Sequence, residues 1–97
     1  MALETLSEAI ERLGARGFRR SLRAREGMLE VVETGATLEP EALAIDEIVR
    51  FEGESDPAEA LVLFALRGPD GRPLGTYASP YGPATLREDA EVIHRLG

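Results

Sequence analysis

The chain has 97 residues, of which 43% are hydrophobic, and a formal net charge of −7 at pH 7. It contains no cysteine, no lysine and one histidine, which excludes disulfides, thiolate-ligated metal sites, Schiff-base lysines and sites built from two histidines. The length predicts one domain over residues 1–97, and the negative charge argues against binding to nucleic acid or anionic membranes.

The N-terminal residues lack the pattern of a targeting signal. Residues 1–10 carry Glu4 and Glu8 and have neither a basic start nor a long apolar run. No apolar run in the sequence approaches the length that a membrane-spanning helix needs. We therefore expect a cytoplasmic protein that has no membrane partner.

The first predicted element is a helix that begins near Leu6. Thr5-Leu-Ser-Glu8 is a capping box, because each of its two polar side chains can accept a hydrogen bond from the other residue's amide. Apolar side chains then recur every three or four residues, at Leu6, Ile10 and Leu13. This single stripe predicts a helix with one face packed on a sheet.

Residues 18–25 and 28–33 predict a β-hairpin. Glu26-Gly27 suits its turn, because a two-residue turn needs a positive φ that glycine adopts readily. The register favoured by apolar and opposite-charge pairing places Leu22 opposite Val31, Arg23 opposite Glu30 and Ala24 opposite Leu29.

An uninterrupted apolar run from Ala60 to Leu66 predicts the centre of the sheet, since a strand there needs cover on both faces. The turn Gly68-Pro-Asp-Gly71 then returns the chain as an antiparallel strand over residues 73–79. Residues 45–52 predict another strand, in which Ile48 interrupts the alternation of apolar and polar residues. This interruption indicates a bulge or a half-covered second face.

The remaining segments complete an α+β domain. Residues 34–38 predict a loop, and residues 40–43 predict one helical turn with proline at its start. Thr85-Leu-Arg-Glu88 is a second capping box and opens a C-terminal helix. The predicted order is α-β-β-short α-β-β-β-α, a two-layer sandwich in which the N- and C-terminal helices cover one face of an antiparallel five-stranded sheet.

Charges are segregated along the chain. Residues 12–25 hold six arginines and no acid, whereas residues 26–59 hold eleven acids and Arg50. We interpret the two blocks as neutralising each other across adjacent strands. The alternative is an arginine face for RNA or phosphate.

Six carboxylates lie between Asp46 and Glu59. They could hold Mg²⁺ or Ca²⁺, but no calcium-loop motif fixes them, and strand alternation points Asp46 and Glu47 to opposite faces. We therefore predict a solvated acidic rim, with no metal and no cofactor. The candidate binding residues are Asp46, Arg50, Glu52 and Asp56. Arg50 has a structural alternative, an internal ion pair with Glu52 or Asp56.

No motif indicates a catalytic residue. His94 falls in the last turn of the C-terminal helix, where a surface histidine is ordinary. Thr85 precedes a helix N-terminus, which attracts anions, but the sequence has no glycine-rich cradle or lysine there, and we interpret this threonine as the helix cap.

Most of the sequence resembles a known group of proteins. The most specific segment is Arg50-Phe-Glu-Gly-x-Ser-Asp-Pro57, and Val62-x-Phe-Ala-Leu66 follows it. These residues are similar to those of small bacterial proteins about as long as this chain, some of which are labelled phosphoribosylpyrophosphate synthetase. The resemblance implies a shared small fold. It does not imply that activity, because the acidic strand and small-residue turn that hold ribose phosphate, and the ATP site, are missing.

Three functional hypotheses remain. The first is a non-catalytic binding or protein-interaction module that acts through self-association or a protein partner, because open sheet edges favour dimerisation. The second is a small-molecule or phosphate-ligand binder, or an enzyme, that uses a divalent cation at the acidic loop. A regulatory subunit of a larger enzyme is a third reading.

Overall fold

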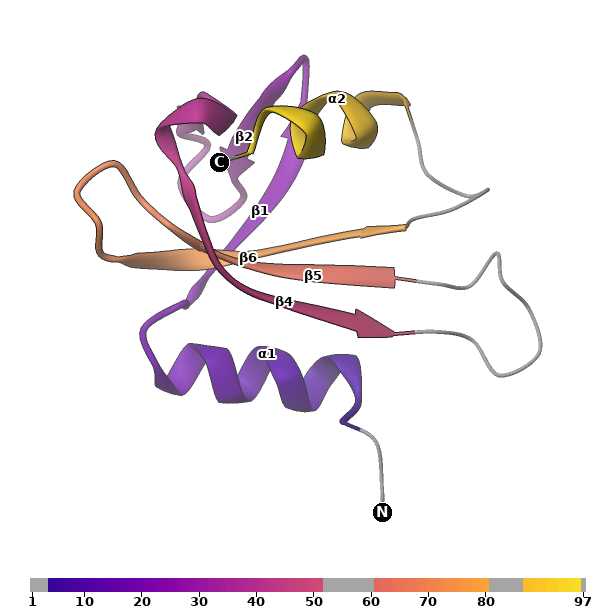
Figure 1. Ribbon diagram of the computed structural model, residues 1–97. Coiled ribbons are helices and arrows are strands. Elements are labelled where there is room, and N and C mark those ends of the chain that lie inside the picture. Colours follow the sequence, from indigo (N-terminus) through magenta and orange to yellow (C-terminus); the bar gives the residue numbers. More distant parts are fainter. Residues whose placement is uncertain (1–3, 52–60, 81–86, 97) are drawn as a thin grey trace.

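In the computed structural model, which describes residues 4–51, 61–80 and 87–96, a six-stranded mixed sheet carries one helix on each face (Figure 1). The elements are α1 (Leu6–Ala15), β1 (Arg20–Arg25), β2 (Met28–Val31), β3 (Thr37–Leu38), the 3-10 turn η1 (Pro40–Ala42), β4 (Ala44–Phe51), β5 (Leu61–Arg67), β6 (Pro73–Pro80) and α2 (Arg87–Arg95). The strands lie in the order β3-β2-β1-β6-β5-β4. This arrangement confirms the α+β class.

The prediction of a five-stranded antiparallel sheet is wrong in two respects. β1 lies parallel to β6, with Arg20, Ser21 and Leu22 opposite Gly75, Thr76 and Tyr77. β3 is a sixth strand that pairs antiparallel with β2, inside the segment predicted as a loop. Two residues are too few to show a periodic pattern, and a pairing between distant segments leaves no local signal.

The two helices lie on opposite faces of the sheet, so the prediction that they share one face is also wrong (Figure 1). Alternate residues of β5 point to the two faces. Leu63 and Ala65 pack with Leu13 of α1, whereas Phe64 belongs to the cluster that contains Val92 of α2. The two-sided burial predicted for β5 is confirmed, since residues 62–66 are all buried. The prediction that this strand is the centre of the sheet is wrong, because β5 lies between β4 and β6, one place from the edge.

Helix α1 begins as its capping box predicts. The Thr5 amide donates to Glu8 Oε1 at 2.9 Å, and the Glu8 amide donates to Thr5 Oγ1 at 3.1 Å. The buried side of the helix is centred on Ala9 and Leu13, whereas Ile10 is 41% exposed. The predicted stripe is therefore displaced, because Ile10 lies at the margin of the face that meets the sheet.

Both predicted turns are confirmed. The β1–β2 hairpin has the expected register, and its turn residues Glu26 and Gly27 have φ angles of 51° and 78°. In the second turn the Gly71 amide donates to the Gly68 carbonyl at 2.9 Å, and β6 follows antiparallel to β5.

Helix α2 is tied to two other segments at its C-terminal end. Arg95 donates to the Glu41 carboxylate through Nε and Nη2, both at 2.7 Å, and to the Gly27 carbonyl through Nη1 at 2.6 Å. Near its start, Glu88 accepts a hydrogen bond from the Glu26 amide at 2.6 Å. The predicted capping partner Thr85 lies outside the described residues. No helix in the described part of the chain is long and apolar enough to cross a membrane.

Candidate functional site

Strand β4 positions the candidate site, and a bulge divides it. Ile45 stands opposite Leu66 and Glu47 opposite Ala65, so Asp46 is an extra residue between two consecutive pairs. The irregularity that Ile48 indicated in the sequence is therefore present as a bulge. Beyond it, Ile48 and Arg50 rejoin Ile45 on the face that α2 covers in part.

On the opposite face, arginines from two other elements hold Asp46 and Glu47. Arg16 donates to Glu47 at 2.9 Å and to Asp46 at 3.1 Å. Arg67 donates to Asp46 at 2.8 Å, and Arg12 donates to Glu47 at 2.7 Å. The prediction that the two acids point to opposite faces is wrong, because the extra residue of the bulge turns Asp46 to the side of its neighbour.

These contacts lower the pKa of both carboxyl groups. Hydrogen bonding from Arg67 lowers the pKa of Asp46, and hydrogen bonding from Arg12 lowers the pKa of Glu47. The Arg16 and Arg67 guanidinium carbons also lie 5.5 and 5.7 Å from the centroid of the buried Phe18 ring. Asp46 therefore belongs to a structural network that joins α1, β4 and β5.

Other arginines of the basic block are also paired. Arg23 and Arg25 donate to the two oxygens of Glu30 at 2.5 and 2.8 Å, and the Glu30 side chain is 8% exposed. Together with the contacts of Arg12 and Arg16, these pairs confirm that acids neutralise much of the basic block. Less positive charge is then left for an RNA or phosphate face.

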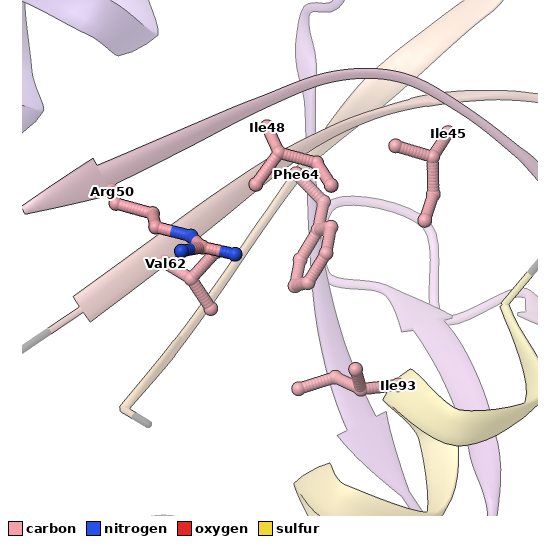
Figure 2. A pocket seen from close by; sticks show the side chains of 6 residues that line it. All are labelled: Ile45, Ile48, Arg50, Val62, Phe64 and Ile93. Atoms are coloured by element: carbon pink, nitrogen blue, oxygen red, sulfur yellow. The ribbon is translucent and has the colours of Figure 1, made fainter. Parts of the chain in front are cut away.

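The other side of β4 forms the wall of an apolar groove (Figure 2). This β4 groove has a volume of about 430 Å³ and is lined by Ile45, Ile48, Arg50, Val62, Phe64 and Ile93. β4 and β5 supply five of these side chains, and Ile93 comes from α2. Ile48 is 48% exposed, and Phe64 stacks on Tyr77 with ring centroids 5.8 Å apart.

Arg50 is the charged member of the described residues that line the β4 groove. Figure 2 shows its guanidinium beside Val62, turned toward Phe64. No ion pair joins Arg50 to a carboxylate within residues 4–51, 61–80 and 87–96. An aliphatic surface with one guanidinium suits a ligand that is both apolar and anionic.

The predicted binding residues are therefore not brought together as a set. Asp46 and Arg50 lie on opposite faces of β4, and Asp46 is already held by two arginines. Glu52 and Asp56 lie outside the described residues, as does the alternative ion pair of Arg50 with either of them. Sequence reasoning missed Ile45, Val62, Phe64 and Ile93, since apolar residues of this kind look like core. The signal that could have found the groove is Ile48, the apolar residue out of step in its strand.

The described residues also bear on metal and catalytic sites. They include no group of three His, Asp or Glu residues placed to hold a metal ion. His94 is exposed on α2, as expected for a surface histidine. No side-chain hydrogen bond within the described residues joins His94 to a serine or another nucleophile.

The edge of the sheet next to the groove is long. β4 is the outermost strand on its side and has eight residues, whereas the opposite outer strand, β3, has two. An outer strand presents main-chain amides and carbonyls that can pair with another strand. The bulge at Asp46 leaves residues 47–51 as the regular part of this edge.

Comparisons with known proteins found no matching family model, no matching curated protein and no matching solved structure.

Proposed function

We propose that this chain is a non-catalytic binding module that self-associates through the outer edge of β4. The observation that carries the proposal is the regular stretch of this outermost strand at residues 47–51, beside an exposed Ile48. Strand addition satisfies main-chain groups along such an edge, and side chains on its two faces select the partner. A second copy is the partner we propose.

One register suits a symmetric antiparallel pair. Centring the pair on Val49 keeps the paired residues within 47–51 and leaves the bulge outside. Val49 then faces its own copy, Ile48 faces Arg50 of the other copy, and Glu47 faces Phe51. No like charges stand opposite each other, whereas a pair centred on Arg50 would oppose two guanidinium groups.

Four carboxylates of the described chain are engaged by other side chains, which supports a binding role over a catalytic one that would use them. Asp46, Glu47 and Glu30 are held by arginines, and the buried Asp89 accepts a hydrogen bond from Tyr77. A catalytic acid or base needs a polar group that is available to a substrate. We propose that the module acts in the cytoplasm through protein contacts and without nucleic acid.

Sedimentation equilibrium of the full chain tests self-association. We expect a concentration-dependent shift from 10.5 kDa toward twice that mass. Ile48→Lys and Ile48→Glu both remove the exposed isoleucine, but only lysine places a like charge opposite Arg50 of the other copy. In a symmetric pair this contact occurs twice, so Ile48→Lys should dissociate about tenfold more readily than Ile48→Glu.

Val32→Lys is the matched control, because Val32 is 50% exposed and lies outside β4. It should self-associate like the parent chain. A monomer at every concentration up to the millimolar range would overturn the proposal. Equal weakening by the two Ile48 variants would overturn the register centred on Val49.

The competing proposal is a phosphate-ligand binder or enzyme that uses a divalent cation at the acidic loop. Its residues Glu52 and Asp56 lie outside the described part, and Asp46 is engaged by Arg16 and Arg67. A thermal-shift screen of nucleotides and sugar phosphates, with and without Mg²⁺, separates the two proposals. A magnesium-dependent rise in melting temperature would favour the second.

A further inference from the structure

We infer that the β4 groove binds an amphipathic monocarboxylate, with its hydrocarbon body on the isoleucine and Phe64 side chains and its carboxylate on Arg50. The groove shares Ile48 and Arg50 with the proposed self-association, but its ligand would lie on the face that α2 partly covers, whereas self-association uses the main-chain edge of β4. It assigns a ligand class to a surface built by three elements.

The walls of the groove fit a hydrocarbon body. Five of the six side chains that line it are aliphatic or aromatic, and Ile93 faces the sheet residues from α2 (Figure 2). A volume of about 430 Å³ holds roughly fourteen water-sized groups at about 30 Å³ each. A methylene is of similar size, so an unbranched chain of about ten carbons fits this space.

The charge of the groove specifies the head group. Arg50 presents a planar guanidinium that can bind both oxygens of a carboxylate. The neighbouring acids Asp46 and Glu47 do not oppose an anion there, because they lie on the other face and are held by Arg12, Arg16 and Arg67. One guanidinium matches a single negative charge, whereas a phosphate group usually gathers several donors.

The methyl signals of the isoleucines in NMR spectra report directly on ligand binding in the groove. The chain has four of them, at Ile10, Ile45, Ile48 and Ile93. Three line the groove, and Ile10 lies on α1 across the sheet. A sample labelled at isoleucine δ1 methyls is titrated with sodium decanoate, sodium octanoate or decanol, each below the concentration at which it self-associates.

We expect decanoate to shift the methyl signals of Ile45, Ile48 and Ile93 to saturation and to leave Ile10 unmoved. Removing two methylenes should weaken binding about fifteenfold, because each buried methylene contributes about a factor of four. Decanol should bind about fivefold more weakly than decanoate, as expected for the loss of an exposed ion pair. The protein is kept dilute enough to be monomeric by sedimentation.

Arg50→Gln is the decisive variant, since it removes the charge from an exposed position and leaves the apolar walls intact. It should abolish the preference for decanoate over decanol, whereas Arg72→Gln, an exposed arginine in the turn before β6, should preserve it. The inference would be overturned if no methyl signal shifted, or if the shifts included Ile10 and did not saturate. It would also be overturned if Arg50→Gln still preferred decanoate to decanol. Because these readings use monomeric protein, their failure leaves the self-association proposal intact.

Discussion

The hydroxyl of Tyr77 on β6 donates a hydrogen bond to Oδ1 of Asp89 on α2, and both side chains are buried. Burial is the main cause that raises the pKa of Tyr77, and the neighbouring Asp89 carboxylate adds to it. The pair fixes the first turn of α2 to the middle of the sheet. A polar contact in this position makes the docking of the helix specific, in addition to the apolar contact of Val92.

Replacing Tyr77 with phenylalanine should destabilise the fold by about 2 kcal/mol, because the Asp89 carboxylate would stay buried without its donor. Urea unfolding at pH 7 measures the loss. Adding Asp89→Asn to Tyr77→Phe should recover part of it, since an amide is cheaper to bury than a charge. The raised pKa of Tyr77 also implies that its contribution to stability is complete below pH 10 and is lost as the pH rises further, because the unfolded chain then releases the phenolic proton first. Equal alkaline losses in the parent and in Tyr77→Phe would contradict this.

Glu30 should make the stability of the fold depend on pH in the acidic range. Hydrogen bonding, first from Arg23 and then from Arg25, holds its pKa below the ordinary 4.5. A lowered pKa in the folded chain gives stability that is complete above pH 4.5 and is lost as the pH falls through the folded value. We therefore expect Glu30→Gln to lower the melting temperature at pH 7 and the difference from the parent to shrink below pH 4.5. Glu11→Gln, a change at an exposed helix position, should track the parent throughout.

Gly75 should be the least replaceable glycine of the sheet. An added Cβ would lie 2.2 Å from the Arg20 carbonyl oxygen, where β6 meets β1. Gly75→Ala must therefore push the two strands apart, and we expect a loss of at least about 2 kcal/mol in urea unfolding. Gly14→Ala is the matched control, because nothing lies within 4 Å of its added Cβ. That substitution lies in α1 and should stabilise by about 0.5 to 1 kcal/mol. Similar losses for both would contradict the close approach of β1 and β6.

Deleting Asp46 should give a folded chain with a longer regular edge. Ile45 and Glu47 already face consecutive residues of β5, so the deletion closes the ladder without changing its register. The contacts of Asp46 with Arg16 and Arg67 are lost, and the melting temperature should fall. Bulges discourage edge pairing, so the deletion should self-associate more tightly in sedimentation. Asp46→Asn keeps the bulge and removes the charge; equal self-association of the two variants would contradict this role of the bulge.

Short sequence patterns correctly predicted the features that depend on neighbouring residues. The capping box at Thr5 and the register around Glu26-Gly27 were correct because each depends on residues close together in the sequence. The parallel contact of β1 with β6 could not be predicted in this way, since its partners are distant and no local pattern marks them. The placement of the two helices on opposite faces could have been predicted from the sequence. A strand buried on both faces requires a cover on each, and only two long helices were available.

The candidate site was predicted only in part. Arg50 was singled out as a cation in an acidic stretch, and it lies in the β4 groove. Asp46 was grouped with it on sequence proximity, but the bulge places the two on opposite faces. The aliphatic members of the groove gave no signal, because the same residue types fill the core. Distinguishing them requires knowing which part of the sheet α2 leaves uncovered.

The parallel pairing of β1 with β6 also bears on how the molecule assembles. The sheet consists of two meanders of neighbouring strands, β1-β2-β3 and β4-β5-β6, and this three-residue seam is their junction in the strand order. Each meander pairs strands that are neighbours in the sequence, whereas the seam pairs β1 with the distant β6. We therefore expect the docking of the two meanders to limit the folding rate. Helix α2 follows the second meander in the chain and contacts β1 and η1. Because α2 also packs on Phe64 and Tyr77 of the second meander, it holds the two halves of the sheet together.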